Sequence, residues 1–479
     1  MALAVLRVLI GCLFVICVCS ASRVAAATPN IVLILADDLG YGDVGAFNAD
    51  SKIPTPNLDR LAAEGMRFTD AHAGGSVCVP SRYSLLTGRF SVRDKLQWRD
   101  GPVIKNDQMT IASLLKQHGY RTSMVGKWHQ GFDTPGPDSD AQFDYDQPLR
   151  GGPVDRGFQT FFGMHASLDI PPYFYIRDRT PVVPPTDSID ASTSVGGKED
   201  WNKIQGAFWR EGPVAPGFVH TEVTPRFARE AVEVLQAYAA TDNEAPLFLY
   251  LALPSPHTPW LPTEAFRGKS GAGMYGDFVM QVDAVVGQVV SALNSTAMSN
   301  DTLVLFSSDN GPVWYDTDTD RFGHDAVGGL RGMKGSSWEG GHRMPFIARW
   351  PGHVTPGTAS DQTIAFSDVF ATFADLVGSA DIPAGQAEDS VSFLPFLLDA
   401  EMPRQSRAPI VHNSSTLRDG DWKLILPRRK RELGKTGSQK LGGELYNLRD
   451  DPNEEKNLFE SESERVERMQ KKLASILAS

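Results

Sequence analysis

The most regular feature of the sequence is a series of short apolar runs in which hydrophobic and polar residues do not alternate. Three such runs cover residues 30–36, 246–253 and 302–306, and residues 121–125, which end in Met-Val, are predicted to form a further core strand. Runs of this kind are typical of strands that are covered on both faces, as they are in a parallel sheet. Segments with helical periodicity accompany them at residues 57–64, 110–118, 224–240 and 277–293. The pattern predicts an α/β fold with a doubly wound, mostly parallel sheet and helices on both faces.

The region at residues 131–220 lacks such periodicity. It is rich in proline, glycine and aspartate, and we predict that it forms loops over one edge of the domain.

The end of the chain has a different pattern again. Short apolar runs at residues 409–412, 422–426 and 444–448 precede a helical pattern at 462–478. They predict a small antiparallel subdomain with a terminal helix. We therefore divide the chain into an α/β domain at residues 28–400 and a C-terminal α+β subdomain at residues 401–479.

Residues 1–27 have the composition of a cleaved signal peptide. Arg7 precedes the apolar run Val8–Cys19, and small residues stand before Thr28. The run is too short to span a bilayer, and a lipoprotein anchor at Cys12 is a weaker alternative. We expect an exported protein that is periplasmic, secreted or lumenal, with no stable membrane span.

Removal of this segment changes both the cysteine content and the charge. Three of the four cysteines lie within it, so Cys78 becomes the sole thiol and an intrachain disulfide is excluded. The remaining chain has 44 basic and 58 acidic residues, a net charge of −14. This balance disfavours nucleic acid as a partner.

Polar residues follow the predicted strands directly. Asp37 and Asp38 follow the first strand, and Asp309 and Asn310 follow the last. Four such oxygen donors at one edge of a sheet would suit Ca²⁺ or Mg²⁺ and would not suit zinc or copper. The alternative is that these residues only form turns and caps.

Three further segments carry candidate chemistry. Lys127 and His129 combine a cation and a titratable imidazole in one short loop, and His257 and Lys334 stand in similarly polar segments. Taken alone, each of these side chains is more typical of a solvated surface.

The stretch from Ser76 to Arg89 connects these observations. It contains Cys78-Val-Pro-Ser-Arg82 followed by Leu-Leu-Thr-Gly-Arg, and a helix is predicted from Pro80 to near Gly88. This stretch resembles the signature of the type I sulfatases, which belong to the alkaline phosphatase superfamily. The resemblance extends from about residue 30 to residue 458.

The resemblance implies a set of site residues. Cys78 would be oxidised to formylglycine by a formylglycine-generating or other sulfatase-maturing enzyme. The metal, Ca²⁺ with Mg²⁺ as the alternative, would be bound by the formylglycine at Cys78 with Asp37, Asp38, Asp309 and Asn310. The sulfate and nucleophile contacts would be Arg82, Lys127, His129, His257 and Lys334. The chain departs from the usual pattern at Gln130 and Met333, and we expect those changes to affect packing.

The same resemblance implies a mechanism. The hydrated aldehyde would attack sulfur, while His257 or Lys334 would protonate the leaving alcohol. His129 would then deprotonate the second hydroxyl so that the aldehyde re-forms and sulfate leaves. The predicted substrate is an aryl sulfate or a sulfated carbohydrate, and export favours an extracellular sulfated carbohydrate.

Side chains within residues 131–220 would then select the substrate or only anchor the loops. The candidates are Tyr173, Tyr175, Arg177, Trp201, Phe208, Trp209 and Arg210. The basic run Arg428–Arg431 is more typical of a solvated hairpin tip than of a polyanion site.

Two other functions remain open from the sequence. One is a phosphate or phosphonate monoester hydrolase of the same superfamily, and the other is a sugar-binding relative in which Cys78 is never modified. Rates on paired sulfate and phosphate esters would distinguish the first, and mass spectrometry of the Cys78 peptide would distinguish the second.

Overall fold

The computed structural model describes residues 28–134, 143–197, 199–241, 244–379, 382–427 and 442–478. The predicted signal peptide at residues 1–27 and the basic run Arg428–Arg431 lie outside the described residues.

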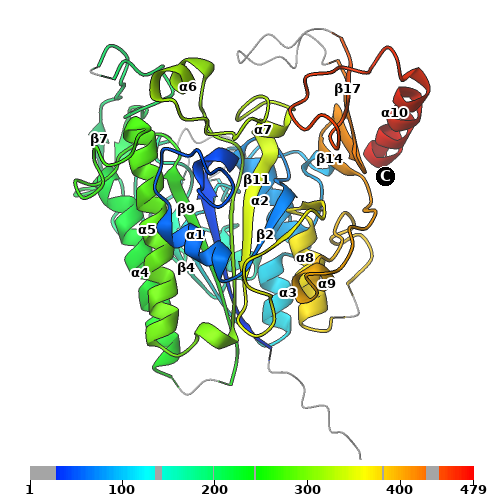
Figure 1. Ribbon diagram of the computed structural model, residues 1–479. Helices are drawn as coiled ribbons and strands as arrows, with labels where there is room; N and C mark the ends of the chain where they lie inside the picture. Colours follow the sequence, from blue (N-terminus) through cyan, green and yellow to red (C-terminus); the bar gives the residue numbers. More distant parts are fainter. Residues whose placement is uncertain are drawn as a thin grey trace, which may run out of the picture.

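A large mixed sheet forms the centre of the molecule (Figure 1). Its strands lie in the order β12-β2-β11-β10-β1-β9-β3-β4-β5-β6, and β13 pairs with β2. The five central strands are parallel, namely β10 (Thr302–Ser308), β1 (Asn30–Asp37), β9 (Leu247–Pro256), β3 (Arg121–Lys127) and β4 (Thr160–Met164). The flanking strands are β2 (Met66–His72), β11 (Arg343–Arg349), β12 (Thr358–Ser360), β13 (Ile364–Ala365), β5 (Ile176–Arg177) and β6 (Thr180–Pro181). The predicted mostly parallel α/β sheet is confirmed.

Helices cover both faces of this sheet. One face packs against α1 (Pro56–Ala63), α4 (Val223–Ala239) and α5 (Gly273–Ser295), and the other against α2 (Cys78–Thr87), α3 (Ile111–Gln117) and α8 (Asp368–Leu376). The side chains of β1 alternate between the two cores: Ile31, Leu33 and Leu35 enter one, and Val32, Ile34 and Ala36 the other. This double burial explains why the strand is apolar without alternation.

The remaining elements are short. They are α6 (Asp316–Phe322), α7 (Glu339–His342), α9 (Leu394–Leu398), β7 (Asp187–Ile189), β8 (Gly212–Val214) and five 3-10 turns, Tyr41–Asp43, Ser91–Arg93, Pro153–Arg156, His220–Glu222 and Ser299–Asp301.

The structure corrects several predicted boundaries. The helix that carries Cys78 begins at Cys78 itself and not at Pro80, because a proline in the first turn of a helix lacks only an N–H that would have no partner there. Helix α5 begins at Gly273, four residues before the predicted start. The predicted loop region contains β4, which pairs in parallel with β3 and was missed because it has only five residues, one of them glycine.

The C-terminal part forms a second, smaller sheet, as predicted. Its antiparallel strands lie in the order β14 (Ile410–Asn413), β15 (Thr416–Asp419), β16 (Trp422–Ile425) and β17 (Glu444–Asn447), with α10 (Ser463–Ala478) beside them. Strand β15 was not predicted. This sheet and α10 share a hydrophobic cluster with Phe90 and Ala365 of the larger part.

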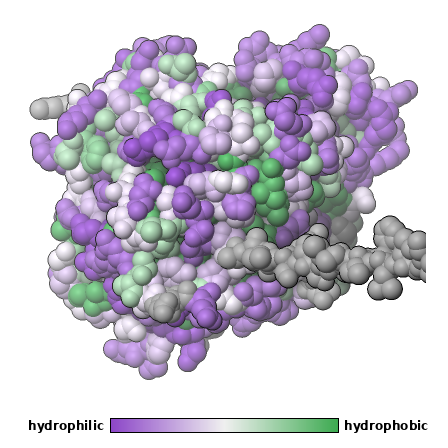
Figure 2. Space-filling view, turned by 60° about the horizontal axis from the view of Figure 1, so that its bottom comes forward, coloured by the Kyte–Doolittle hydropathy of each residue, from purple (hydrophilic) through white to green (hydrophobic). Residues whose placement is uncertain are grey.

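Helix α5 is long and apolar enough to cross a membrane by length and composition. However, 72% of its most apolar window is buried inside the molecule, which fits its place as a core helix. Figure 2 shows the end of the molecule at which β1 begins, where hydrophilic residues predominate and hydrophobic residues occur in small groups.

Candidate active site

The candidate residues meet where the central parallel strands end. Register pairs join the last residues of β1 to those of its two neighbours: Ala36 lies beside Ser308 of β10, and Asp37 lies beside Pro256 of β9. The carboxyl ends of β1, β3, β9 and β10 therefore share one edge of the sheet, as expected for ligand sites in open α/β folds.

We call the residues gathered there the strand-end cluster. Its members are Asp37, Asp38, Cys78, Arg82, Lys127, His129, His257, Asp309, Asn310 and Lys334. The structure brings together all ten residues that the sequence nominated, although they come from six segments of the chain.

The acidic members surround Asp38. Potential ligand atoms of Asp37, Asp38, Cys78 and His257 all lie within 4.8 Å of one another. The N–H of Asp38 donates to Oδ1 of Asp309 at 3.2 Å. Asp38 has a left-handed φ of 65°, a strained conformation that commonly occurs at functional sites.

Cys78 is the first residue of α2 and lies at the centre of this group. Its thiol is 3.3 Å from Oδ1 of Asp37, and the residue is almost completely buried. Burial and the charge of Asp37 raise the pKa of the Cys78 thiol well above its ordinary value. The thiol is therefore protonated at neutral pH and is a weak nucleophile as it stands.

Each carboxylate of the cluster has a basic partner. Lys127 Nζ donates to Asp37, Lys334 Nζ lies 2.7 Å from Asp38, and Arg82 Nε lies 2.8 Å from Asp309. Burial would raise the pKa of Asp37, but chiefly the charge of Lys127 holds it well below its usual value. Three carboxylates and three cations make the group formally neutral.

His129 is buried, and both of its ring nitrogens lack a hydrogen-bond partner. Its backbone has a left-handed φ of 54°, and its ring packs edge-on against Trp98 at 4.6 Å. Burial and the nearby charges of Lys127 and Arg82 hold the pKa of His129 well below its usual value. The imidazole is therefore neutral and can accept a proton.

His257 differs because one of its nitrogens is fixed. Its Nδ1 lies 2.6 Å from the carbonyl oxygen of Thr258, so Nδ1 carries a proton that it donates there. Its Nε2 lies 3.7 Å from Oδ2 of Asp38.

The cluster has the properties of a site for a hard divalent cation. The side-chain oxygen of Asn310 is buried and has no partner, while its amide nitrogen is held 2.6 Å from Asp38. Burial and the charge of Asp37 raise the pKa of Asp309 to about 6, which a bound cation would reverse. Carboxylate and amide oxygens are the ligands that Ca²⁺ and Mg²⁺ prefer.

Sequence reasoning missed one neighbour of the cluster. Asp169 is buried, with Oδ1 unpartnered and 3.9 Å from Nδ1 of His257, and its other oxygen accepts from Arg210. No spacing or strand end draws attention to Asp169, which lies in the predicted loop region.

Most of the nominated loop side chains anchor the loops. Tyr173 is buried, Trp201 packs on Trp260 at 4.7 Å, and Arg177 pairs with Glu230. Arg210 differs from these because its half-exposed side chain pairs with Asp169, which lies beside His257 of the strand-end cluster.

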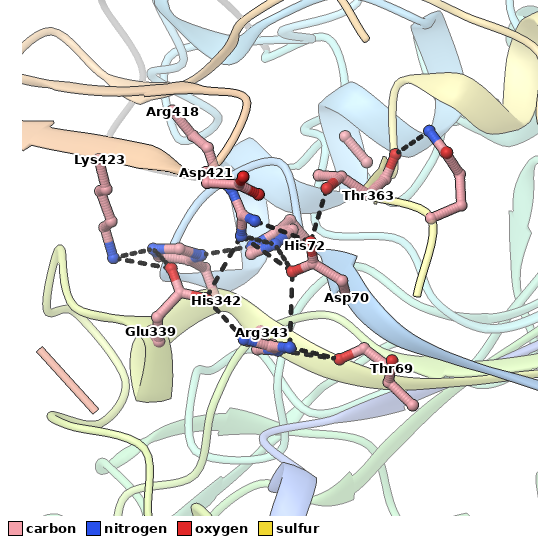
Figure 3. A network of polar contacts seen from close by, with 12 residues as sticks. Thr69, Asp70, His72, Glu339, His342, Arg343, Thr363, Arg418, Asp421 and Lys423 are labelled. Atoms are coloured by element: carbon pink, nitrogen blue, oxygen red, sulfur yellow. Dashed lines mark hydrogen bonds and ion pairs between the residues drawn. The ribbon is translucent and has the colours of Figure 1, made fainter. Parts of the chain in front are cut away.

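A second buried group of charges lies between the main sheet and the C-terminal sheet (Figure 3). We call it the junction cluster, and its members are Asp70, His72, Glu339, His342, Arg343, His412, Arg418, Lys423 and Glu454. It contains two groups of potential metal ligands, but Arg418 and Lys423 occupy hydrogen-bonding positions on two of its histidines. Those cations oppose binding of a metal ion.

Comparisons with known proteins agree with this geometry. The sulfatase family model matches residues 29–379. An N-acetylgalactosamine-6-O-sulfatase of Bacteroides thetaiotaomicron is 31% identical over 94% of this chain and 93% of its own length, and arylsulfatase A of Bos taurus is 36% identical over 79% and 69%. A solved structure of a 6S-sulfatase connected with the metabolism of multiple glycosaminoglycans by Bacteroides thetaiotaomicron has a TM-score of 0.81 and 27% identity, and covers 95% of this chain and 100% of that one.

Proposed function

This chain belongs to the sulfatase family, and we propose that it is an exported enzyme that removes sulfate from a sulfated carbohydrate. In this proposal the nucleophile is a formylglycine made from Cys78 by a maturing enzyme, and the cofactor is Ca²⁺. Family membership supports hydrolysis of sulfate esters, and the remaining details are inferred from the site.

The observation that carries the proposal is the surroundings of Cys78. The thiol lies at the start of α2, 3.3 Å from Asp37 and beside the cations of the strand-end cluster. A buried, protonated thiol has little use as a nucleophile in that position. A formylglycine there would supply a hydrated aldehyde, whose two hydroxyls allow both attack on sulfur and release of sulfate.

Asp37, Asp38, Asp309 and Asn310 would hold the cation. When bound, it would supply Lewis-acid stabilisation of developing negative charge on oxygen. The formal neutrality of the cluster supports this, because a dication would leave an excess of two positive charges. One ester sulfate and one ionised hydroxyl would balance that excess.

Lys127, Lys334 and Arg82 would bind the sulfate group. In the structure their cationic groups lie against Asp37, Asp38 and Asp309, the carboxylates that would bind the cation. Preorganised charges in a buried site stabilise charge in a transition state more strongly than they would in water. Lys127 and Arg82 are both buried, so their charges would stabilise the transition state more strongly than exposed charges would.

His129 and His257 would move protons in opposite directions. His129 is neutral and has both nitrogens free, so it would accept a proton from the second hydroxyl of the formylglycine hydrate, the step that releases sulfate. His257 donates through Nδ1 to Thr258, so its Nε2 must carry a second proton to act as an acid toward the leaving alcohol. Lys334 is the alternative acid. Burial would lower the pKa of its ammonium group, but the negative charges around it, chiefly that of Asp38, together have the larger effect and raise it, so Lys334 would release its proton less readily.

The substrate class is inferred from the relatives and from Arg210. Two of the relatives are described as sulfatases of glycosaminoglycans or of N-acetylgalactosamine 6-sulfate. The half-exposed guanidinium of Arg210, paired with Asp169 next to His257, could bind hydroxyl or carboxylate groups of a sugar. Export would bring the enzyme to such polymers outside the cytoplasm.

A combined experiment tests the proposal. Mass spectrometry of the Cys78 peptide from the native host should show the aldehyde form, and the same preparation should hydrolyse N-acetylgalactosamine 6-sulfate and 4-nitrophenyl sulfate faster than 4-nitrophenyl phosphate. Faster cleavage of the phosphate ester would indicate a phosphate or phosphonate hydrolase. An unmodified thiol with sugar binding but no turnover would indicate the binding protein.

A further inference from the structure

Lys334 lies in a segment that forms no helix or strand of its own. Residues 330–338 lead into α7, and Gly332 and Gly335 flank the lysine with left-handed φ angles of 84° and 83°. Within the segment, the N–H of Ser336 donates to the carbonyl oxygen of Met333 at 3.0 Å, and the N–H of Met333 donates to Oγ of Ser336 at 3.2 Å. These bonds shape a local turn around Lys334, and the position of that turn relative to the strand-end cluster depends on what holds the segment from outside.

On one side, the segment is attached to two of the segments that carry other site residues, those of Asp309 and Cys78. The N–H of Lys334 donates to the carbonyl oxygen of Pro312 at 3.0 Å, three residues after Asp309. The N–H of Gly335 donates to the carbonyl oxygen of Ser76 at 2.8 Å, two residues before Cys78. These bonds place one end of the segment relative to the nucleophile.

On the other side, the segment is attached to the C-terminal sheet. The side-chain amide of Asn413 in β14 donates to Oγ of Ser337 at 3.1 Å. The indole N–H of Trp338 donates to Oε2 of Glu444 in β17 at 2.8 Å. Both contacts come from the smaller sheet and lie within four residues of Lys334.

A buried ion network completes this attachment at the start of α7. Lys423 Nζ, from β16, lies 2.9 Å from Oε1 of Glu339 and 2.8 Å from Oε1 of Glu454. The N–H of Glu339 donates to Oε2 of Glu454 at 2.6 Å. All three side chains are fully buried, and Figure 3 shows Lys423 reaching across to Glu339 and His342. Buried ion pairs tolerate little displacement of either partner, so the network fixes the far end of the segment.

We propose that Asn413 and Lys423 are positioning residues for Lys334. The C-terminal sheet then contributes to catalysis without contacting the substrate, by holding the segment from which the Lys334 ammonium group reaches to 2.7 Å from Asp38. This inference rests on the proposed function, because it assigns the sheet a part in the same reaction.

A double-mutant cycle tests it. Asn413→Ala and Lys423→Met are each made in the wild-type and Lys334→Ala backgrounds, and kcat and KM for 4-nitrophenyl sulfate are measured on the matured enzyme with Ca²⁺. We expect Asn413→Ala to lower kcat about tenfold in the wild-type background. In the Lys334→Ala background the further loss should be less than about twofold, since the two changes act on one group.

Asn447→Ala is the matched control. Asn447 is also a partly buried asparagine of this sheet, but its amide donates to Asp450 and not to the Lys334 segment. The kcat of Asn447→Ala should equal that of the wild type. Equal losses from Asn413→Ala in both backgrounds, or from Asn447→Ala, would show general loosening of the sheet and overturn the proposal.

A second measurement does not depend on turnover. The rate at which an amine-reactive ester acylates Lys334, read by peptide mass spectrometry, should rise in Asn413→Ala and stay unchanged in Asn447→Ala. An unchanged rate in Asn413→Ala would overturn the positioning role. Because this readout works without catalysis, it separates failure of the inference from failure of the proposed function, and Asn413→Ala remains informative if Lys423→Met does not fold.

Discussion

The strand-end cluster and the junction cluster are both buried groups of opposite charges, but they differ in how completely their polar atoms are paired. In the strand-end cluster both ring nitrogens of His129 and the side-chain oxygen of Asn310 lack partners. In the junction cluster Arg418 binds Asp70 through two parallel hydrogen bonds, of 2.8 and 2.9 Å, and Lys423 lies between two glutamates.

The difference separates two uses of buried charge. Buried polar atoms without partners are costly, and in native proteins they commonly mark a place where another molecule or ion binds. A network in which most charged groups are paired, as in the junction cluster, instead fixes the relative position of the elements that supply it. Even there, Nε2 of His412 lacks a hydrogen-bond partner, and Oε1 of Glu454 has only its ion pair with Lys423. We therefore expect changes in the strand-end cluster to remove activity, and changes in the junction cluster to reduce stability as well.

The largest effect should come from Cys78→Ser. A serine cannot become a formylglycine by the same oxidation, and its hydroxyl would keep any sulfate that it accepted. We expect turnover of 4-nitrophenyl sulfate to fall by roughly 10³-fold or more. The midpoint of thermal unfolding should remain close to that of the wild type, because the substitution is nearly isosteric. Activity close to wild type would contradict the assignment of Cys78.

Removal of the cation should have the next largest effect. Treatment with a chelator should lower kcat by roughly 10²-fold or more and lower the unfolding temperature, because a ligand at 100 times its Kd stabilises by about 2.7 kcal/mol. Ca²⁺ should restore both quantities, and Mg²⁺ should be tested beside it. In Asp309→Asn the added cation should raise the unfolding temperature much less. A chelator-resistant enzyme would argue against the proposed ligands.

A pair of matched substitutions compares the clusters directly. Lys423→Met removes the cation paired with buried Glu454 and the nearest of the cations around buried Glu339, and should lower the free energy of unfolding by about 3–5 kcal/mol. Lys127→Met, with Ca²⁺ present, should cost less stability because the cation still neutralises Asp37, yet it should lower kcat/KM by roughly 10²-fold or more. Urea unfolding and kinetics on the same preparations would measure both. Equal losses of stability in Lys423→Met and Lys127→Met would contradict the proposed difference between the two clusters.

The smallest effect concerns pH. Burial holds the pKa values of His72, His342 and His412 below the ordinary 6.5. Below that pH the unfolded chain therefore binds protons that the folded chain does not, and stability falls by up to about 1.4 kcal/mol per pH unit for each histidine.

His412→Phe should make this pH dependence less steep. It removes one titrating group but keeps a ring to stack on His342, 3.7 Å away. Urea midpoints measured between pH 7 and pH 5 would show the change in slope. An unchanged slope would mean that His412 does not titrate in this range.

The sequence was sufficient for most of the central strands, and insufficient where a strand is very short or carries buried charge. Strands β1, β3, β9 and β10 were found because both of their faces are buried. Strand β2 was missed because Asp70 and His72 suggest exposure, whereas both are buried against Arg418, which lies almost 350 residues further along the chain. Long-range pairing of this kind leaves no local pattern.

The same reasoning applies to the sites. The strand-end residues could be nominated because they follow strands and match a long motif around Cys78. The junction residues could not be nominated, because an isolated lysine or glutamate in a sequence, such as Lys423 or Glu339, is usually a surface residue. Asp169 was missed for the same reason.

The order in which the chain is synthesised has a consequence for Cys78. The partners that enclose the thiol come from both ends of the sequence: Asp37 precedes it by 41 residues, while Asp309 and Lys334 follow by more than 230. The site around residue 78 is complete only when β10 has joined β1. If Cys78 is converted as proposed, the modifying enzyme would therefore have its access during synthesis and early folding, and completion of the sheet would end that period.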